Sequence, residues 1–345
     1  MMKTLAIAMI AGSAATASGQ LTLNLVNQID LLDTQDPASA SFIGSNPSAV
    51  GWDGTNMYVA GWNNGRGAGT DHGLVGIANA ASSDALGTAF GQIPTPDFRG
   101  YNSVDVQNGR VLAGYDGGSA NPQGLAIYNG ATGALEDSRN ERVAFANFDP
   151  SNGGDVAWSV FGSGRLRVVD QNNLPGPTTF DGTNGPVIFA GSTIQRGQDI
   201  DDNGNITLND ANGNLTHFTR TGAGSTGTQL LLASGLGVGN GNNNAILNTG
   251  FGDFVLYNDR NGNTYGSSIA GVDTAGNPIA LPINGVDLST ATSTGWWDFD
   301  YDSATGTLAA VEFSTRQAFV FQVVPAPGTA ALLGLGGLAA ARRRR

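Results

Sequence analysis

A recurring unit of about 50 residues constrains the fold of this chain more than any other feature. In each unit an acidic or small residue precedes an apolar one, a turn follows, and a strand rich in Val, Leu or Ile comes next. The turn is usually Asn-Gly or Asp-Gly, which suits a two-residue hairpin because both of its central residues need positive φ. The clearest copy reads DIDDNGNITL over 199–208 and NGNLTHF over 212–218.

The spacing of these units predicts the architecture. Successive acidic anchors lie 50, 44, 54 and 45 residues apart, and a first copy over 48–62 precedes them by about 55 residues. The anchors are Asp105, Asp155, Asp199, Asp253 and Asp298. A period near 50 with two hairpins per unit is what a four-stranded propeller blade needs. We therefore predict an all-β chain, a β-propeller of six four-stranded blades over residues 20–323, with tandem β-sandwich domains as the alternative.

The composition agrees with strands and narrows the chemistry. Gly contributes 52 residues and charged residues only 13%, about half the usual share. Cysteine is absent, which excludes thiol chemistry, iron–sulfur clusters and Cys-ligated zinc. Apart from Lys3 and the last four arginines, 11 basic residues face 28 acidic ones, a balance of −17. Such a body repels nucleic acid, so we expect no nucleic-acid partner.

The N-terminus predicts export. Lys3 supplies a positive charge, and the apolar run from Leu5 to Ala17 ends in small residues. This order is typical of a secretory signal peptide, which we assign to residues 1–19 and expect the Sec machinery to use. A buried N-terminal helix is the alternative.

The C-terminus, residues 324–345, predicts a temporary membrane anchor. Pro325 and Pro327 favour an extended segment, followed by Gly328 and the uncharged run Thr329–Ala341. That run is shorter than the about 20 residues of a stable transmembrane helix. Arginines resist translocation and stay cytoplasmic. The tail ends in four of them: Arg342, Arg343, Arg344 and Arg345.

This tail resembles the PEP-CTERM sorting signal. The resemblance covers residues 324–345 and rests on the order of Pro-x-Pro, apolar run and terminal arginines. It implies an exosortase-type processing enzyme as partner, transient insertion in the inner membrane, and delivery to the cell surface or the extracellular matrix. Ala326 stands where the family most often has Glu. A plain C-terminal membrane anchor is the alternative.

The fourth unit also resembles the NHL-type repeat of six-bladed propellers. Its Asp-x-x-Gly-Asn-Ile core spans residues 201–206, and a return strand runs to Phe218. The resemblance implies a central channel and loops at each end of the ring that are available for binding.

The same unit contains a calcium-loop spacing. Oxygen-bearing residues fall at positions 1, 3, 5 and 12, with Gly204 at position 6, as in an EF-hand or dockerin loop. These weak metal candidates are Asp199, Asp201, Asn203 and Asp210. An EF-hand loop is followed by a helix, whereas residues 216–219 read as a strand. A hairpin therefore explains the pattern better, and we expect no cofactor, with calcium as the alternative.

Other catalytic signals are weak. His72 and His217, the only histidines, sit beside no metal-ligand partner or nucleophile in the sequence, and no nucleophile elbow, phosphate loop or dinucleotide fingerprint occurs. We assign no catalytic residue. The five tryptophans favour packing between blades, with sugar stacking at the channel as the alternative; they are Trp52, Trp62, Trp158, Trp296 and Trp297.

Two functions follow from these patterns. The first is a non-enzymatic surface protein whose propeller binds exopolysaccharide or surface proteins. The second is a metal-dependent hydrolase of the gluconolactonase type that uses one inward-pointing carboxylate per blade. Its candidate carboxylates are Asp105, Asp155, Asp199 and Asp253.

Ring closure is a separate expectation. Leu21, Leu23 and Leu25 alternate with polar residues, which gives one apolar face at period two. A propeller must join its first and last blades, or two sheet edges stay open. We predict that residues 21–29 complete the last blade beside the strands of residues 308–323.

Overall fold

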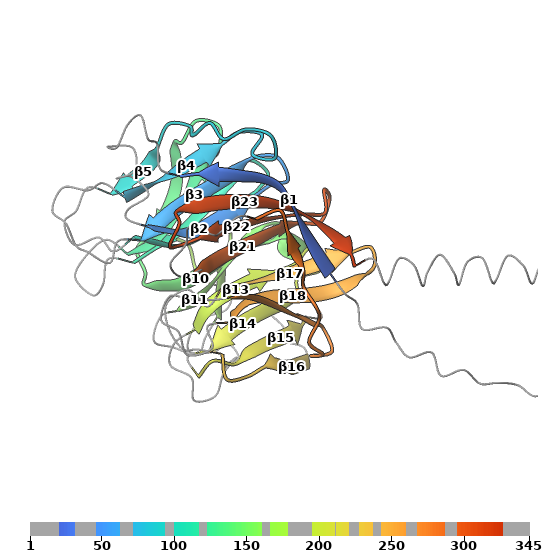
Figure 1. Ribbon diagram of the computed structural model, residues 1–345. Coiled ribbons are helices and arrows are strands. Elements are labelled where there is room, and N and C mark those ends of the chain that lie inside the picture. Colours follow the sequence, from blue (N-terminus) through green and yellow to red (C-terminus); the bar gives the residue numbers. More distant parts are fainter. Residues whose placement is uncertain are drawn as a thin grey trace, which may run out of the picture.

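The computed structural model describes residues 21–31, 46–62, 72–93, 100–116, 123–160, 166–178, 195–210, 212–220, 228–236, 243–259, 268–286 and 295–326. Within these residues the chain is all-β, and six small sheets form a six-bladed β-propeller (Figure 1). The predicted propeller is therefore confirmed, and the tandem β-sandwich alternative is not what the chain adopts.

The sheets are numbered here as blades 1 to 6, and the strands of blades 1 to 5 run from the innermost outward. Blade 1 consists of β2 (Asn46–Trp52), β3 (Met57–Trp62), β4 (His72–Ile77) and β5 (Phe90–Ile93). Blade 2 consists of β6 (Tyr101–Gln107), β7 (Arg110–Tyr115), β8 (Gly124–Asn129) and β9 (Leu135–Arg139). Blade 3 consists of β10 (Val143–Asp149), β11 (Asp155–Val160) and β12 (Leu166–Val169), with a short 3-10 helix, η2 (Pro150–Asn152), after β10.

Blade 4 consists of β13 (Gln195–Ile200), β14 (Ile206–Asp210), β15 (Leu215–Thr219) and β16 (Thr228–Ala233). Blade 5 consists of β17 (Asn244–Thr249), β18 (Gly252–Asp259) and β19 (Ser268–Asp273). Blade 6 runs from the channel outward through β21 (Trp296–Asp302), β22 (Thr307–Glu312), β23 (Gln317–Pro325), β1 (Leu21–Asp30) and β20 (Ile283–Asn284).

The hairpin turns follow the expected chemistry. Asn108 and Gly109 join β6 to β7 with φ of 52° and 75°. Both central residues therefore occupy the left-handed region that an Asn-Gly turn requires. This local preference fixes where the innermost strand of blade 2 ends.

The N-terminal strand closes the ring. β1 pairs antiparallel with β23, from Leu21 opposite Pro325 to Asp30 opposite Gln317. The prediction that residues 21–29 complete the last blade is confirmed. β23 continues to Pro325, two residues beyond the boundary expected at residue 323, and Ala326 after it is buried.

A β-bulge lets β1 serve both neighbouring blades. The register shifts between Leu25 and Asn27, which moves the following side chains to the opposite face of the strand. Leu21 and Leu23 accordingly pack with blade 5, whereas Ile29 packs with blade 1. The simple alternation that we expected therefore holds only as far as the bulge.

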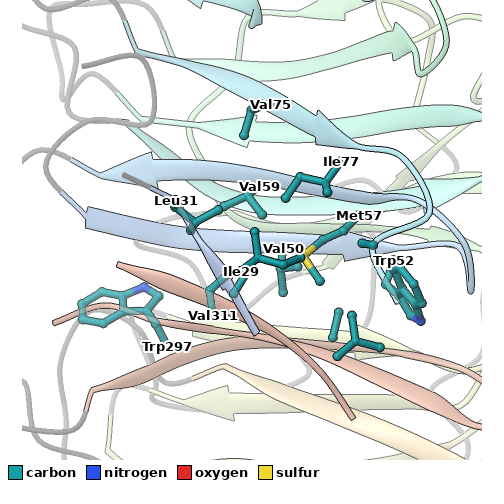
Figure 2. Packing of buried hydrophobic residues seen from close by; sticks show 14 of the residues in the cluster. Ile29, Leu31, Val50, Trp52, Met57, Val59, Val75, Ile77, Trp297 and Val311 are labelled. Carbon is teal, nitrogen blue, oxygen red and sulfur yellow. The ribbon is translucent and has the colours of Figure 1, made fainter. Parts of the chain in front are cut away.

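The core consists of interfaces between blades. Among the described residues there are six buried apolar clusters, one at each pair of adjacent blades around the ring. Figure 2 shows the cluster between blades 6 and 1, where Ile29, Val311 and Trp297 meet Val50 and Val59. Because this interface is as apolar as the others, the first and last blades are packed together and the ring is complete.

The tryptophans belong to these interfaces. Trp52, Trp158, Trp296 and Trp297 are buried in apolar clusters, and Trp62 is partly buried against one. Packing between blades, the favoured prediction, is confirmed, and Trp52 also lines the cavity at the channel mouth.

The terminal segments lie mostly outside this description. The description does not include residues 1–20 or 327–345. The expected signal peptide, Pro327, Gly328 and the four terminal arginines therefore lie outside the described residues. In the described part of the chain no helix has the length and apolar character to cross a bilayer.

Candidate functional site

The innermost strands of the six blades surround the channel, and three of them carry an aspartate at matching positions. Asp105 lies on β6, Asp199 on β13 and Asp300 on β21, which belong to blades 2, 4 and 6. All three residues are partly buried and line the mouth of the channel. The intervening blades differ, since Asn147 holds the matching position in blade 3.

Each of these carboxyls bonds to the next blade. Oδ2 of Asp105 accepts a hydrogen bond from the backbone N–H of Phe148 at 2.6 Å. Asp199 accepts one in the same way from Ile246 at 2.5 Å, and Asp300 from Trp52 at 2.6 Å. The three carboxyls therefore join blade 2 to 3, 4 to 5 and 6 to 1, an alternating pattern around the ring.

The junction between blades 6 and 1 has a second carboxyl of this kind. Oδ2 of Asp298, which is 1% exposed, accepts a hydrogen bond from the backbone N–H of Val50 at 2.8 Å. The Nε1 group of Trp52 also donates to Thr307 across this junction. These polar contacts supplement the apolar cluster where the ring closes.

Burial changes the proton affinity of the channel carboxyls. It raises the pKa of Asp199 to about 8 and that of Asp105 to about 6, from the ordinary value of 3.8. Burial, together with the neighbouring carboxyls of Asp105 and Asp199, raises the pKa of Asp300 well above its usual range. The backbone donors act in the opposite direction but do not outweigh desolvation.

The channel opens into a polar cavity of about 250 Å³ at one end of the propeller. The turns that follow the innermost strands form its rim, and Ser303 of blade 6 donates a hydrogen bond to Asp202 of blade 4 across it at 2.5 Å. No Lys or Arg occurs among the described lining residues, which include seven aspartates: Asp53, Asp105, Asp199, Asp201, Asp202, Asp300 and Asp302. The charged side chains of the mouth are therefore all acidic, although the pKa of about 8 leaves Asp199 mostly protonated at neutral pH.

A second cavity, of about 370 Å³, lies between blades 4 and 5. Its walls come from β15 and β16 on one side and from β17 and β18 on the other. It shares Asp201, Ile246 and Asn248 with the channel mouth, so the two cavities adjoin on the same end of the propeller. His217 and Asp253 line it as well.

The expectation of one inward carboxylate per blade is wrong for two of the four candidates. Asp105 and Asp199 line the channel mouth, but Asp155 begins β11 and Asp253 lies in β18, the second strands of blades 3 and 5. In the third and fifth units the aspartate that the spacing selects belongs to the second strand, because both hairpins of a blade have similar turn chemistry.

Asp300 was not recognised as a channel residue from the sequence. A signal for it exists, since Asp298, Asp300 and Asp302 alternate with aromatic residues along β21. A strand with one polar face and one apolar face, placed innermost in a blade, directs the polar face to the channel.

The weak calcium candidates do not converge. Asp201 closes the turn after β13, where Oδ1 accepts hydrogen bonds from the backbone N–H groups of Asn203 and Asn205. Asp210 closes the next turn in the same way, at the far end of β14. Asp199 points to the channel mouth. The segment therefore forms two successive hairpins, and the described residues contain no group of three or more His, Asp or Glu side chains arranged to hold a metal ion.

Comparison with known proteins supports the β-propeller fold and does not identify a family or a function. No protein-family model matches the chain, and no curated protein sequence does either. Among solved structures, the chain resembles the β-propeller domain of Cps50 (Swd1) from Myceliophteria thermophila, with a TM-score of 0.55. The two are 11% identical in sequence, and the match covers 88% of this chain and 100% of that one. This likeness shows a shared β-propeller fold.

Proposed function

We propose that this chain is an exported protein, delivered to the cell surface or extracellular matrix, whose propeller acts as a non-enzymatic binding module. The two ends of the sequence support delivery. A signal peptide covers residues 1–19, and a sorting tail covers residues 324–345, which an exosortase-type enzyme processes after transient insertion in the inner membrane. The ligand is a surface polysaccharide or protein.

One observation carries the preference for binding over catalysis. Each inward carboxyl of Asp105, Asp199 and Asp300 already accepts a backbone hydrogen bond from the neighbouring blade. Oδ1 of Asp105 and Oδ1 of Asp199 each accept a further backbone hydrogen bond, from the N–H group of the next residue, so both oxygens of these two carboxyls are engaged. A general base or metal ligand needs an oxygen that is directed at the reacting atoms. These carboxyls instead link neighbouring blades, and the described lining residues of the channel mouth include no histidine. A gluconolactonase-type reaction therefore has weaker geometric support.

The test uses the processed full chain isolated from exporting cells. We expect saturable binding to extracellular polysaccharide or surface protein from the same cells, measured by biolayer interferometry. We expect less than one divalent ion per chain by mass spectrometry of the metals, and no lactone hydrolysis with added Ca²⁺, Mg²⁺, Mn²⁺ or Zn²⁺. Stoichiometric metal with hydrolysis that Asp199→Asn abolishes would replace binding by catalysis. Asp84→Asn, at an exposed position outside both cavities, is the matched control.

A further inference from the structure

The cavity between blades 4 and 5 has a lining suited to a polyhydroxylated ligand. Nine of its eleven described lining residues carry polar side chains. They include the amides of Asn205, Gln229 and Asn248 and the hydroxyls of Thr219, Thr228 and Thr274. Such groups donate and accept hydrogen bonds, as sugar hydroxyls do. The volume of about 370 Å³ lies in the range of small-molecule sites, roughly 300–1,000 Å³.

An unsatisfied polar group marks this cavity. His217 lies in its wall, is 6% exposed, and its Nδ1 atom has no hydrogen-bond partner. Burial lowers the pKa of His217, although Asp201 and Asp253 act to raise it. Most buried polar atoms in proteins are hydrogen-bonded, so an exception calls for an explanation. Nδ1 is itself enclosed, so a ligand hydroxyl would satisfy it after the imidazole turns toward the cavity.

Charge selects among hydroxylated ligands. Asp201 and Asp253 contribute two carboxylates to the lining. Both oxygens of the buried Asp201 accept hydrogen bonds within its own turn, so the exposed Asp253 is the carboxylate that a ligand can contact directly. No Lys or Arg is among the described residues of this cavity or of the channel mouth. An anionic sugar is therefore repelled, and a protonated amine is attracted. The described side chains of Asp201, His217 and Asp253 do not form a metal-binding group, which favours an organic cation over a divalent ion.

The two adjoining cavities together can hold a ligand longer than one sugar unit, along an acidic surface. Because the cavity shares Asp201, Ile246 and Asn248 with the acidic channel mouth, an oligomer seated between the blades can extend toward the channel over further carboxyls. Leu230 and Ile246 are the apolar members of the lining and suit the C–H surface of a sugar ring.

We propose that the cavity between blades 4 and 5 binds a saccharide that carries free amino groups, with the amine at Asp253 and a hydroxyl at His217. This assignment rests on the binding function proposed above and names the ligand class and its location.

The experiment compares three probes on the full chain by isothermal titration calorimetry. They are the glucosamine hexamer chitohexaose, its neutral N-acetylated form, and hexalysine. We expect chitohexaose to bind, and the acetylated hexamer to bind about tenfold more weakly, the effect of losing one charge-assisted hydrogen bond. We expect hexalysine to bind more weakly than chitohexaose. Equal affinity for both sugars would overturn the amine requirement, and tighter binding of hexalysine would replace the saccharide by a basic peptide.

Variants locate the site. Asp253 is exposed, so Asp253→Asn should fold normally, and we expect it to weaken chitohexaose binding about tenfold. His217→Gln should weaken it as well, whereas Asp84→Asn, a matched change at a distant exposed position, should not. Unchanged affinity in Asp253→Asn would overturn this location. If chitohexaose fails to bind while the chain still binds extracellular material from its own cells, this inference falls and the proposed function stands.

Discussion

Asp199, one of the channel carboxyls with a raised pKa, couples the stability of this propeller to pH. Its pKa is raised in the folded chain to about 8, from 3.8, because burial disfavours the charge. Between these pH values the unfolded chain has released a proton that the folded chain retains. Stability therefore falls as pH rises through this window and loses no more above it.

The variant Asp199→Asn tests this coupling, because an amide stays uncharged at every pH. Between about pH 4 and pH 8 we expect the free energy of unfolding of the wild type to fall relative to that of the variant, by at most about 1.4 kcal/mol per pH unit. The melting temperature of the wild type should fall relative to that of the variant over the same range. Thermal melts of both proteins over this range measure it, with Asp84→Asn expected to follow the wild type. Wild type gaining on Asp199→Asn as pH rises would show that the folded carboxyl is ionised.

At the scale of elements, β1 decides whether the ring is closed. Leu21, Leu23 and Ile29 are fully buried, and each contributes about 1.5–3 kcal/mol by burial. Without β1, β23 would also expose an unpaired edge that other chains can join. Because β1 contacts both blade 5 and blade 1, its loss affects two interfaces besides its own sheet.

We therefore expect deletion of residues 21–29, with the signal peptide retained, to lower the melting temperature of the whole propeller in a single transition. The milder change Leu23→Ala should cost about 2–5 kcal/mol, since it leaves a cavity in a packed core. Val26→Ala, at a position that is 45% exposed, is the control and should change little. A wild-type melting midpoint in the deleted chain would mean that β1 is dispensable for closure.

At the scale of the whole molecule, the two chain ends leave the propeller side by side. Leu21 pairs with Pro325, so the proposed signal peptide and sorting tail are attached at neighbouring positions on blade 6 (Figure 1). Pro325 and the buried Ala326 belong to the folded body. A folded propeller thus presents the tail from one edge, next to the strand that completes the ring.

The proposed sorting predicts a specific processed form. We expect surface protein to lack Arg342 to Arg345, and a variant with these four residues changed to Ser to escape into the medium, because the cytoplasmic stop is lost. Intact-mass analysis of protein from cells, together with the amount in the medium, measures both. A surface chain that ends at Arg345 would instead indicate a plain membrane anchor.

The sequence by itself determined the all-β class, the blade count and the closing strand, because these depend on local turn chemistry and on a period that repeats along the chain. Tertiary structure decided which aspartates face the channel. Asp105 and Asp253 look alike as anchors in the sequence, yet one lies on an innermost strand and the other on a second strand. The strand order within a blade, the bulge in β1 and the cavity beside His217 arise from contacts between residues far apart in sequence, and no local pattern specifies them.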